Sequence, residues 1–319
     1  MCLSALAIDA HRRFPLVLAA NRDEFFDRPA ARLAWWTPEH GGPAILSGRD
    51  LVAGGTWLGL TAEGRLALVT NVRKAASVPD PDAPSRGQLV TSWLRGDQRP
   101  ERFWPTAAMA GHQPFNLIAC DFREGMSFWA SSETACPQRI ERGVFGLSNG
   151  RLDEPWPKVR QLTARLADAL DASDSVDDLA GRMMSALADR TPAPDADLPD
   201  TGIGLERERM LSPAFIRSPD GRYGTRSSTL VITERVQKRL VTHVLERSFT
   251  AGPGVALLRR STLRDWPPKY LLETDGQAEP AVEIGSVDEA HLAEHPGESG
   301  AGTVRRRRVR SLLRPISKV

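Results

Sequence analysis

Residues 1–25 have the sequence MCLSALAIDAHRRFPLVLAANRDEF, and two apolar runs within it predict the centre of a sheet. The first run extends from Cys2 to Ala10 and the second from Phe14 to Ala20, with a polar turn at residues 11–13 between them. Two short apolar runs joined in this way are typical of a β-hairpin. Both are almost continuously apolar, which favours strands covered on both faces.

Outside this hairpin, strand patterns come in groups that helix patterns separate. Strands are predicted at residues 57–60, 66–71, 115–120, 126–130, 144–148, 228–233 and 240–246. Helices are predicted at residues 85–95 and, as a broken pair, at 155–189, where Leu162, Leu166 and Leu170 recur at helical spacing. This order predicts a layered α+β fold rather than a regular βαβ alternation.

The composition excludes several classes of protein. The 319 residues carry 42 Lys and Arg against 40 Asp and Glu, so bulk charge does not point to a nucleic-acid partner. Three cysteines form no disulfide framework, which favours a reducing compartment. No run approaches the roughly 20 apolar residues of a membrane helix, and the N-terminus lacks a signal-peptide pattern. We therefore expect a soluble, cytoplasmic protein without a transmembrane segment.

The last part of the chain differs in composition from the rest. From Ala251 onward Pro, Gly and Glu increase, and residues 305–310 form a basic end. This predicts a domain over 1–250 and a flexible C-terminal extension over 251–319, whose removal is expected to leave the domain folded. Residues 291–295, HLAEH, match an inverted zinc-protease pattern, but Pro296 and Gly297 follow at once. No metal site is predicted.

Cys2 is the first candidate for chemistry. If Met1 is removed, Cys2 carries a thiol and a free α-amine, with reference pKa values of about 8.5 and about 8. The amine can then take the proton of the thiol near neutral pH, as in an N-terminal nucleophile. The other interpretation is a buried cysteine at the start of an inner strand.

Asn21-Arg22-Asp23-Glu24 directly follows the second apolar run. Charged groups at the end of a buried strand need partners, since burying an unpaired charge is costly. Asp23 could bind the α-ammonium group of Cys2, and Arg22 could hold a thiolate or a substrate carboxylate. A salt-bridge cluster with Arg28 or Arg49 is the alternative interpretation.

Three further polar residues stand at the ends or starts of predicted strands. Asn71 and Asn149 could supply side-chain amides to an oxyanion, although each is also an ordinary turn residue. Arg226 lies in a polar segment, Gly224 to Ser228, before a strand and could face the same site.

These motifs together resemble the NRDE family, also called the transport and Golgi organisation protein 2 family. The resemblance covers about residues 1–249 with its motifs in order and leaves out Ala251 to Val319. It rests on Met1-Cys2, Asn21 to Phe25 with Arg28-Pro29, Gly55 to Gly59, Gly64 to Asn71, Gly146 to Asn149, Tyr223 to Thr229, and Glu246 to Phe249.

The family is in turn similar to N-terminal nucleophile hydrolases of the choloylglycine hydrolase and penicillin V acylase type. That resemblance implies a four-layer αββα sandwich in which Cys2 matches the nucleophile and Asp23 the acid that orients its amine. It also implies that Asn71 and Asn149 match oxyanion amides and that Arg226 matches a late active-site arginine. One position departs from the pattern: three residues before the aspartate those amidases have arginine, whereas this chain has Ala20, with arginine at Arg22 instead.

Two functional hypotheses follow. The first is a cysteine amidohydrolase without a cofactor that acts on a small or lipid-like amide, with Cys2, Arg22, Asp23, Asn71, Asn149 and Arg226 as catalytic residues and Asn21, Glu24 and Trp57 binding the ligand. The second is a non-enzymatic cytoplasmic carrier or trafficking factor that binds haem, a lipid or acyl-CoA in the same cleft, as the family resemblance implies. The oligomeric state is not predicted.

Overall fold

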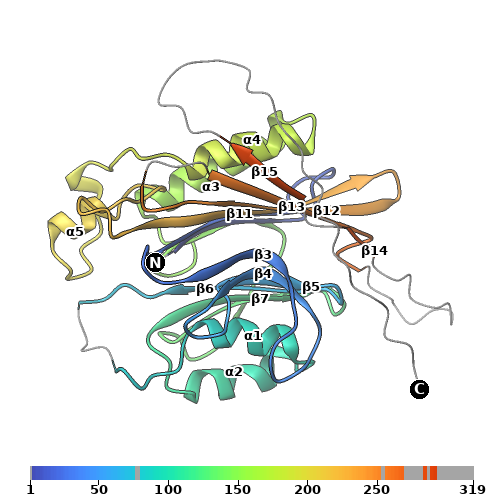
Figure 1. Cartoon of the computed structure of the whole chain (residues 1–319), viewed down its shortest axis with the longest axis horizontal. Coiled ribbons are helices and arrows are strands. Elements are labelled where there is room, and N and C mark those ends of the chain that lie inside the picture. The colour runs from blue at the N-terminus through green and yellow to red at the C-terminus, as the bar shows by residue number, and fades with distance from the viewer. Residues whose placement is uncertain (1, 76–79, 253–255, 269–282, 286–287, 293–319) are drawn as a thin grey trace.

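A computed structural model describes residues 2–75, 80–252, 256–268, 283–285 and 288–292 of the chain. It consists of two antiparallel sheets that stack face to face, with a pair of helices on the outer side of each (Figure 1). The α+β class and the four-layer αββα order predicted from the sequence are confirmed. Within the described residues, no helix is both long and apolar enough to cross a membrane.

The first sheet, sheet A, has the strand order β10-β1-β2-β11-β12-β13-β14, and β15 also pairs with β13. The predicted hairpin is part of this sheet: β1 and β2 pair along their length and lie between β10 and β11. Its strands are β1 (Cys2–Ile8), β2 (Leu16–Phe25), β10 (Gly143–Leu147), β11 (Tyr223–Val236), β12 (Arg239–Ser248), β13 (Ala256–Arg264), β14 (Glu283–Ile284) and β15 (Asp288–Leu292).

The second sheet, sheet B, is a meander in which each strand pairs with the next along the chain. Antiparallel neighbours can be joined by short turns, but residues 72–114, which contain two helices, connect the fourth and fifth strands of this sheet. Its strands are β3 (Ala30–Trp36), β4 (Ile45–Asp50), β5 (Leu58–Thr61), β6 (Arg65–Asn71), β7 (Phe115–Asp121), β8 (Met126–Ser131) and β9 (Gln138–Arg139).

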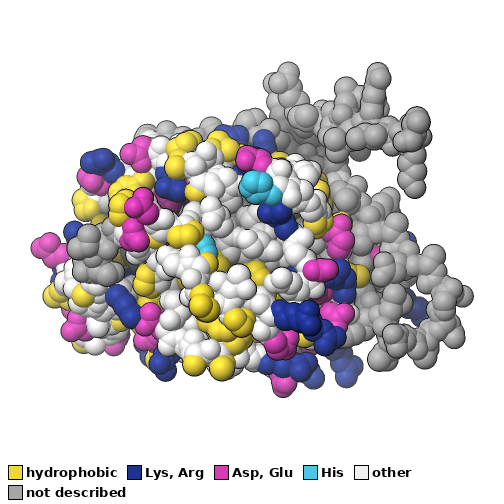
Figure 2. All heavy atoms as spheres, turned by 90° about the horizontal axis from the view of Figure 1, so that it is seen from below, with side chains coloured by type: hydrophobic (Ala, Val, Ile, Leu, Met, Phe, Trp, Pro, Cys, Tyr) yellow, Lys and Arg dark blue, Asp and Glu magenta, His cyan; other side chains and the backbone are white. Residues whose placement is uncertain are grey.

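The helices cover the two outer faces. α1 (Gly87–Arg95) and α2 (Pro100–Met109) lie on sheet B, and α3 (Pro157–Ala172) and α4 (Val176–Leu187) lie on sheet A (Figure 1). A 3₁₀ turn (Asp195–Asp197) and the short α5 (Leu205–Met210) follow α4. Seen from the α1 and α2 side, the surface carries acidic and basic side chains interspersed with apolar ones (Figure 2).

Three apolar cores separate the four layers. On β1, Leu3, Ala5 and Ala7 pack toward α3 and α4, whereas Leu6 packs into the space between the two sheets. The third core lies between sheet B and its helices, around Trp93. Because both faces of β1 and β2 are buried, their sequences are continuously apolar, as the hairpin pattern indicated.

Sheet A does not end at residue 250, where the sequence predicts the domain boundary. β13 pairs with β12 over Leu257 to Arg264, and Leu263 and Trp266 are completely buried between the sheets. The Trp266 indole donates a hydrogen bond of 2.8 Å to the backbone oxygen of Thr61 in sheet B. Residues 256–268 are therefore part of the core rather than of an extension. The basic end at 305–310 and most of the HLAEH segment lie outside the described residues.

Candidate active site

Cys2 lies at the first position of β1, directly opposite Arg22 near the end of β2. Side chains alternate along a strand, so Cys2 and Arg22 share the face of sheet A toward sheet B, and Asp23 lies on the helix-facing side. Asp23 follows Arg22 on β2, and its carboxyl group is close enough to the Cys2 thiol to influence the pKa of that thiol. The structure thus brings together three of the predicted catalytic residues at one end of a hairpin.

The Cys2 thiol is held in its protonated form. The residue is half-buried, and burial, followed by the nearby Asp23 carboxylate, raises the pKa of the thiol above its usual value. A thiol in this environment needs a base to become a nucleophile.

Asp23 is buried, with 1% of its surface exposed. The hydroxyl of Thr225 on β11 donates a 2.7 Å hydrogen bond to its Oδ1 atom. Burial raises the pKa of Asp23, whereas the positive charges of Lys158 and Arg73 act in the opposite direction. The fold thus fixes a carboxyl group beside the beginning of β1.

Asn149 follows the residue that contacts Cys2, and Asn71 is joined to Asn149 through its backbone oxygen. The Ser148 hydroxyl donates a hydrogen bond of 3.0 Å to the backbone oxygen of Cys2, and Asn149 follows in the same segment. The Asn149 side-chain amide donates to the backbone oxygen of Asn71 at 2.9 Å, and its oxygen accepts from Arg73 at 3.4 Å. One of the two amide hydrogens of Asn149 is thus used within the fold, and one is left for a ligand.

The Cζ atom of the Arg22 guanidinium lies over the indole ring of Trp57, 4.3 Å from the ring centroid. Gly48 permits this arrangement, since a Cβ atom there would lie 2.4 Å from the Trp57 ring. Glu24 is near the same group, with its Oε2 atom 3.6 Å from Nη2 of Arg22. Trp57 and Glu24 therefore both contact Arg22, the residue that lies opposite Cys2 in the sheet.

Arg226 is in the same area but is used to shape the chain. It is the extra residue of a bulge between Thr225 and Ser227. Its Nη1 atom donates hydrogen bonds to the backbone oxygens of Phe25, at 2.5 Å, and Arg28, at 3.0 Å. These contacts fix the turn that follows β2.

Asn21, predicted from the sequence to bind the ligand, uses both of its amide hydrogens within the fold. Its amide nitrogen donates to the backbone oxygens of Leu187 and Ala214, both at 2.8 Å, and its oxygen accepts from Ser228 at 2.6 Å. These partners belong to α4, β11 and the segment before β11. Asn21 joins the helix layer to sheet A.

We expect Asn21→Ala to lower the free energy of unfolding by about 3 kcal/mol, because it leaves two buried carbonyl groups and a hydroxyl without their partner. Ser228→Ala, which removes only one of these bonds, should cost about 1 kcal/mol. Urea unfolding of both variants measures the difference. Equal and small losses in the two variants would contradict the structural role of Asn21.

Sequence reasoning missed Lys158, which is 3% exposed. Its ammonium group donates a 2.8 Å hydrogen bond to the backbone oxygen of Leu211, and burial lowers its pKa to about 8. The positive charge of Arg73 lowers the pKa of Lys158 further, whereas Asp23, Cys2 and Glu208 act to raise it. A signal was present, because Lys158 stands one helical turn before Leu162 in the row of Leu162, Leu166 and Leu170.

An arginine–glutamate pair beside the site was also missed. Nη1 of Arg73 lies 2.5 Å from Oε2 of Glu208, and both side chains are almost completely buried. The backbone N–H of Arg73 donates to the backbone oxygen of Asn149 at 2.7 Å. Arg73 and Glu208 are 135 residues apart along the chain, and over that separation the spacing of residues in the sequence does not indicate a contact.

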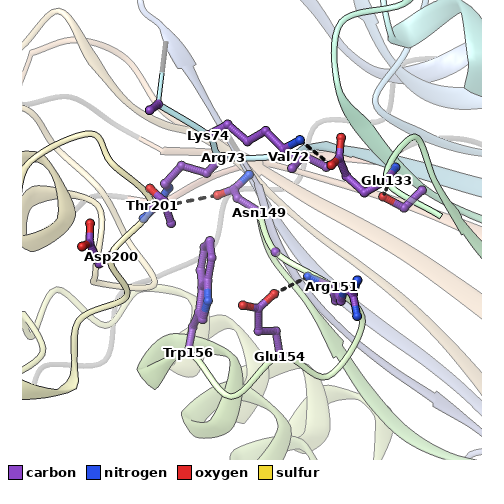
Figure 3. A pocket seen from close by; sticks show the side chains of 13 residues that line it. Val72, Arg73, Lys74, Glu133, Asn149, Arg151, Glu154, Trp156, Asp200 and Thr201 are labelled. Atoms are coloured by element: carbon purple, nitrogen blue, oxygen red, sulfur yellow. Dashed lines mark hydrogen bonds and ion pairs between the residues drawn. The ribbon is translucent and has the colours of Figure 1, made fainter. Parts of the chain in front are cut away.

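A cavity of about 560 Å³ opens next to these residues. Figure 3 shows Asn149, Arg73 and Trp156 around it, with the Lys74–Glu133 ion pair on one side. Asn149 lines the cavity, and the residue before it, Ser148, donates a hydrogen bond to the backbone of Cys2. The described residues contain no group of three His, Cys, Asp or Glu side chains suited to a metal ion.

Among solved structures, the chain is similar to an N-acylethanolamine-hydrolyzing acid amidase orthologue of Caenorhabditis elegans. The TM-score is 0.40 at 10% identity, over 72% of this chain and 92% of that chain. A variant of the conjugated bile acid hydrolase from Clostridium perfringens has a TM-score of 0.42 at 9% identity, over 77% of this chain and 89% of that chain.

The chain has higher sequence identity to curated proteins than to these solved structures. The chain is 30% identical over 254 residues to the human transport and Golgi organization protein 2 homolog, covering 73% of this chain and 89% of that protein. It is 25% identical over 276 residues to the Drosophila melanogaster protein, covering 78% and 93%. The family model described as transport and Golgi organisation 2 matches residues 1–251. The chain belongs to the transport and Golgi organisation 2 family.

Proposed function

We propose that this protein is an N-terminal nucleophile amidohydrolase with Cys2 as its nucleophile. The observation that carries the proposal is the position of Cys2: it begins β1, lies opposite Arg22, and has the buried carboxyl group of Asp23 on the neighbouring strand. Removal of Met1 would place a free amine on Cys2 at the point where Asp23 can orient it.

The reaction then needs only groups of this chain and water. The Cys2 amine takes the thiol proton, and the sulfur attacks the carbonyl carbon of an amide. The remaining amide hydrogen of Asn149 and the guanidinium of Arg22 are the donors available to the oxyanion. As the C–N bond breaks, the ammonium of Cys2 gives its proton to the leaving amine, and water hydrolyses the thioester to release the acid and restore the thiol.

The cavity beside Asn149 supports a small-molecule substrate, since its volume falls within the usual range for such ligands. Its lining combines the Trp156 ring with the Lys74–Glu133 ion pair and with Glu154, which accepts a hydrogen bond from the backbone N–H of Arg151. The carrier function remains the alternative outcome of the test below.

Cys2→Ala is expected to abolish hydrolysis, by about 10⁴-fold or more, with little change in melting temperature. The measurement is amine release from a panel of N-acyl amides and acyl-amino acids, together with the intact mass, which should show loss of Met1. The matched control is a chain with an N-terminal extension that keeps the Cys2 amine in a peptide bond; it should be equally inactive, because that nitrogen has no basicity.

Full hydrolysis by the extended chain would contradict the mechanism. Binding of haem or acyl-CoA by both forms, with no hydrolysis of any amide in the panel, would favour the carrier.

A further inference from the structure

Arg22 is a buried cation whose hydrogen-bonding capacity is not used up. Its side chain is 5% exposed, and its Nη1 atom has no hydrogen-bond partner within the part of the chain that the structure describes. The Nη2 atom is 3.6 Å from Glu24 and 3.7 Å from Asp50, both longer than a normal hydrogen bond. A buried guanidinium donor without an acceptor is costly unless a ligand supplies one.

Neither nearby carboxylate can supply the missing acceptor. Asp50 is engaged by Arg28, whose Nε atom is 2.7 Å from its Oδ2 atom, and by the backbone N–H groups of Val52 and Ala53. Glu24 accepts a hydrogen bond from the backbone N–H of Phe25. Both carboxylates therefore already have other donors.

Two more arginines add positive charge at the same place. Arg86 directly precedes Gly87, whose backbone oxygen accepts a hydrogen bond of 3.4 Å from Thr56, the neighbour of Trp57, and its own Nη1 atom donates to the backbone oxygen of Pro114 at 3.2 Å. Burial lowers the pKa of Arg86, and Cys2 and Glu24 are close enough to act on that pKa in the opposite direction. Arg226 lies close enough to Arg22 for the two charges to repel each other. Arg22, Arg28, Arg86 and Arg226 thus lie around Glu24 and Asp50, and the buried Asp23 carboxyl group is also close to the Cys2 thiol.

We propose that Arg22 and Arg86 form an anion site beside Cys2, and that the molecule bound there carries a carboxylate or phosphate group close to the bond that Cys2 attacks. The substrate part of this statement rests on the proposed function, whereas the anion site does not. The planar guanidinium of Arg22, which lies over the Trp57 ring, can present two parallel N–H groups to an oxyanion. An anionic group would supply the acceptor that the Nη1 atom of Arg22 lacks among the described residues.

The charge of an alkylating reagent tests the site without any substrate. Iodoacetate and iodoacetamide differ chiefly in one negative charge, and both label thiols. The rate ratio of iodoacetate to iodoacetamide should be about tenfold higher at Cys2 than at Cys136, because a focused positive potential raises the local concentration of an anion. Cys136 is exposed and serves as the internal reference, with peptide mass mapping to separate the sites.

Arg22→Met and Arg86→Gln should each bring the Cys2 ratio toward that of Cys136. Arg182→Gln, on the exposed surface of α4, is the matched control and should leave it unchanged. Arg22→Met changes a buried side chain, so its melting temperature is checked first. If this variant does not fold, Arg86→Gln and competition by anions with iodoacetate in the unsubstituted chain still test the site. Competition by inorganic phosphate but not acetate indicates a phosphate site, and equal competition by both indicates a carboxylate site.

Equal ratios at Cys2 and Cys136 in the unsubstituted chain would overturn the anion site. A ratio that Arg86→Gln leaves unchanged would overturn the role of Arg86. A high ratio in a protein that hydrolyses no amide would leave the anion site standing and reject the proposed hydrolysis, so the two failures are distinguishable.

Discussion

A chain that ends at residue 250 is expected to lose its cooperative thermal transition. Truncation there removes β13, which pairs with β12, and Trp266, which is completely buried and forms an edge-to-face contact with Phe122 at 5.5 Å. It also breaks the hydrogen bond from Thr242 to the backbone oxygen of Trp266, 2.6 Å. The loss opens a cavity between the sheets and exposes the edge of β12.

The point variant Trp266→Ala isolates the core contribution and should cost about 3–5 kcal/mol. A chain that ends at residue 268 is the matched control, because it keeps β13 and Trp266. In calorimetry, the chain that ends at residue 268 should show a cooperative transition, and Trp266→Ala should show one at a lower temperature. The chain that ends at residue 250 should show no cooperative transition. A sharp transition at an unchanged temperature in the 250-residue chain would restore the boundary predicted from the sequence.

The second large effect is a pH dependence that belongs to Lys158. Its pKa is lowered from 10.5 to about 8 in the folded protein, so folding disfavours the charged form. The cost is fully present below pH 8 and is relieved as the pH rises from about 8 to 10.5, where only the unfolded chain still binds the proton. At about 1.4 kcal/mol per pKa unit, the relief is on the order of 3 kcal/mol.

We therefore expect the free energy of unfolding of the natural chain, minus that of Lys158→Met, to increase by about 3 kcal/mol between pH 8 and 10.5. The thiols of Cys2 and Cys120 have raised pKa values and therefore lower the stability of both chains above pH 9. Subtracting one free energy of unfolding from the other removes this shared contribution. Denaturant unfolding at several pH values measures the difference. Parallel profiles for the two chains would show that Lys158 keeps an ordinary pKa.

The parts of the fold that were predictable are those with local signals. The hairpin of β1 and β2 and the helix row ending at Leu170 follow from apolar periodicity alone. β3 was not predicted although its sequence, AARLAWW, is apolar except at Arg32. β4 was not predicted because its sequence, ILSGRD, begins with only two apolar residues. α2 was missed since Pro105 lies inside it, and β13 because its arginines hide the alternation that buries Ser261 and Leu263.

The candidate site divides in the same way. Cys2, Arg22 and Asp23 could be found because a hairpin brings them together within the first 25 residues. Arg86, Arg73 and Glu208 come from three separate segments, and only the packing of two sheets and a short helix places them beside Cys2. Asn21 shows the reverse case: it stands within the motif, but its amide points toward the helix layer and is used there.

The hydrogen bonds that join the end of β6 to the segment after β10 have a consequence for ligand binding. Thr70 donates to the backbone oxygen of Ser148 at 2.6 Å, and the Asn149 amide donates to Asn71 at 2.9 Å. These bonds tie the two sheets together at the end that holds Cys2, so groups from both sheets keep a constant separation in the free protein. The entropy of ordering the site is therefore lost during folding, and a ligand that fits needs to give up only its own freedom of motion.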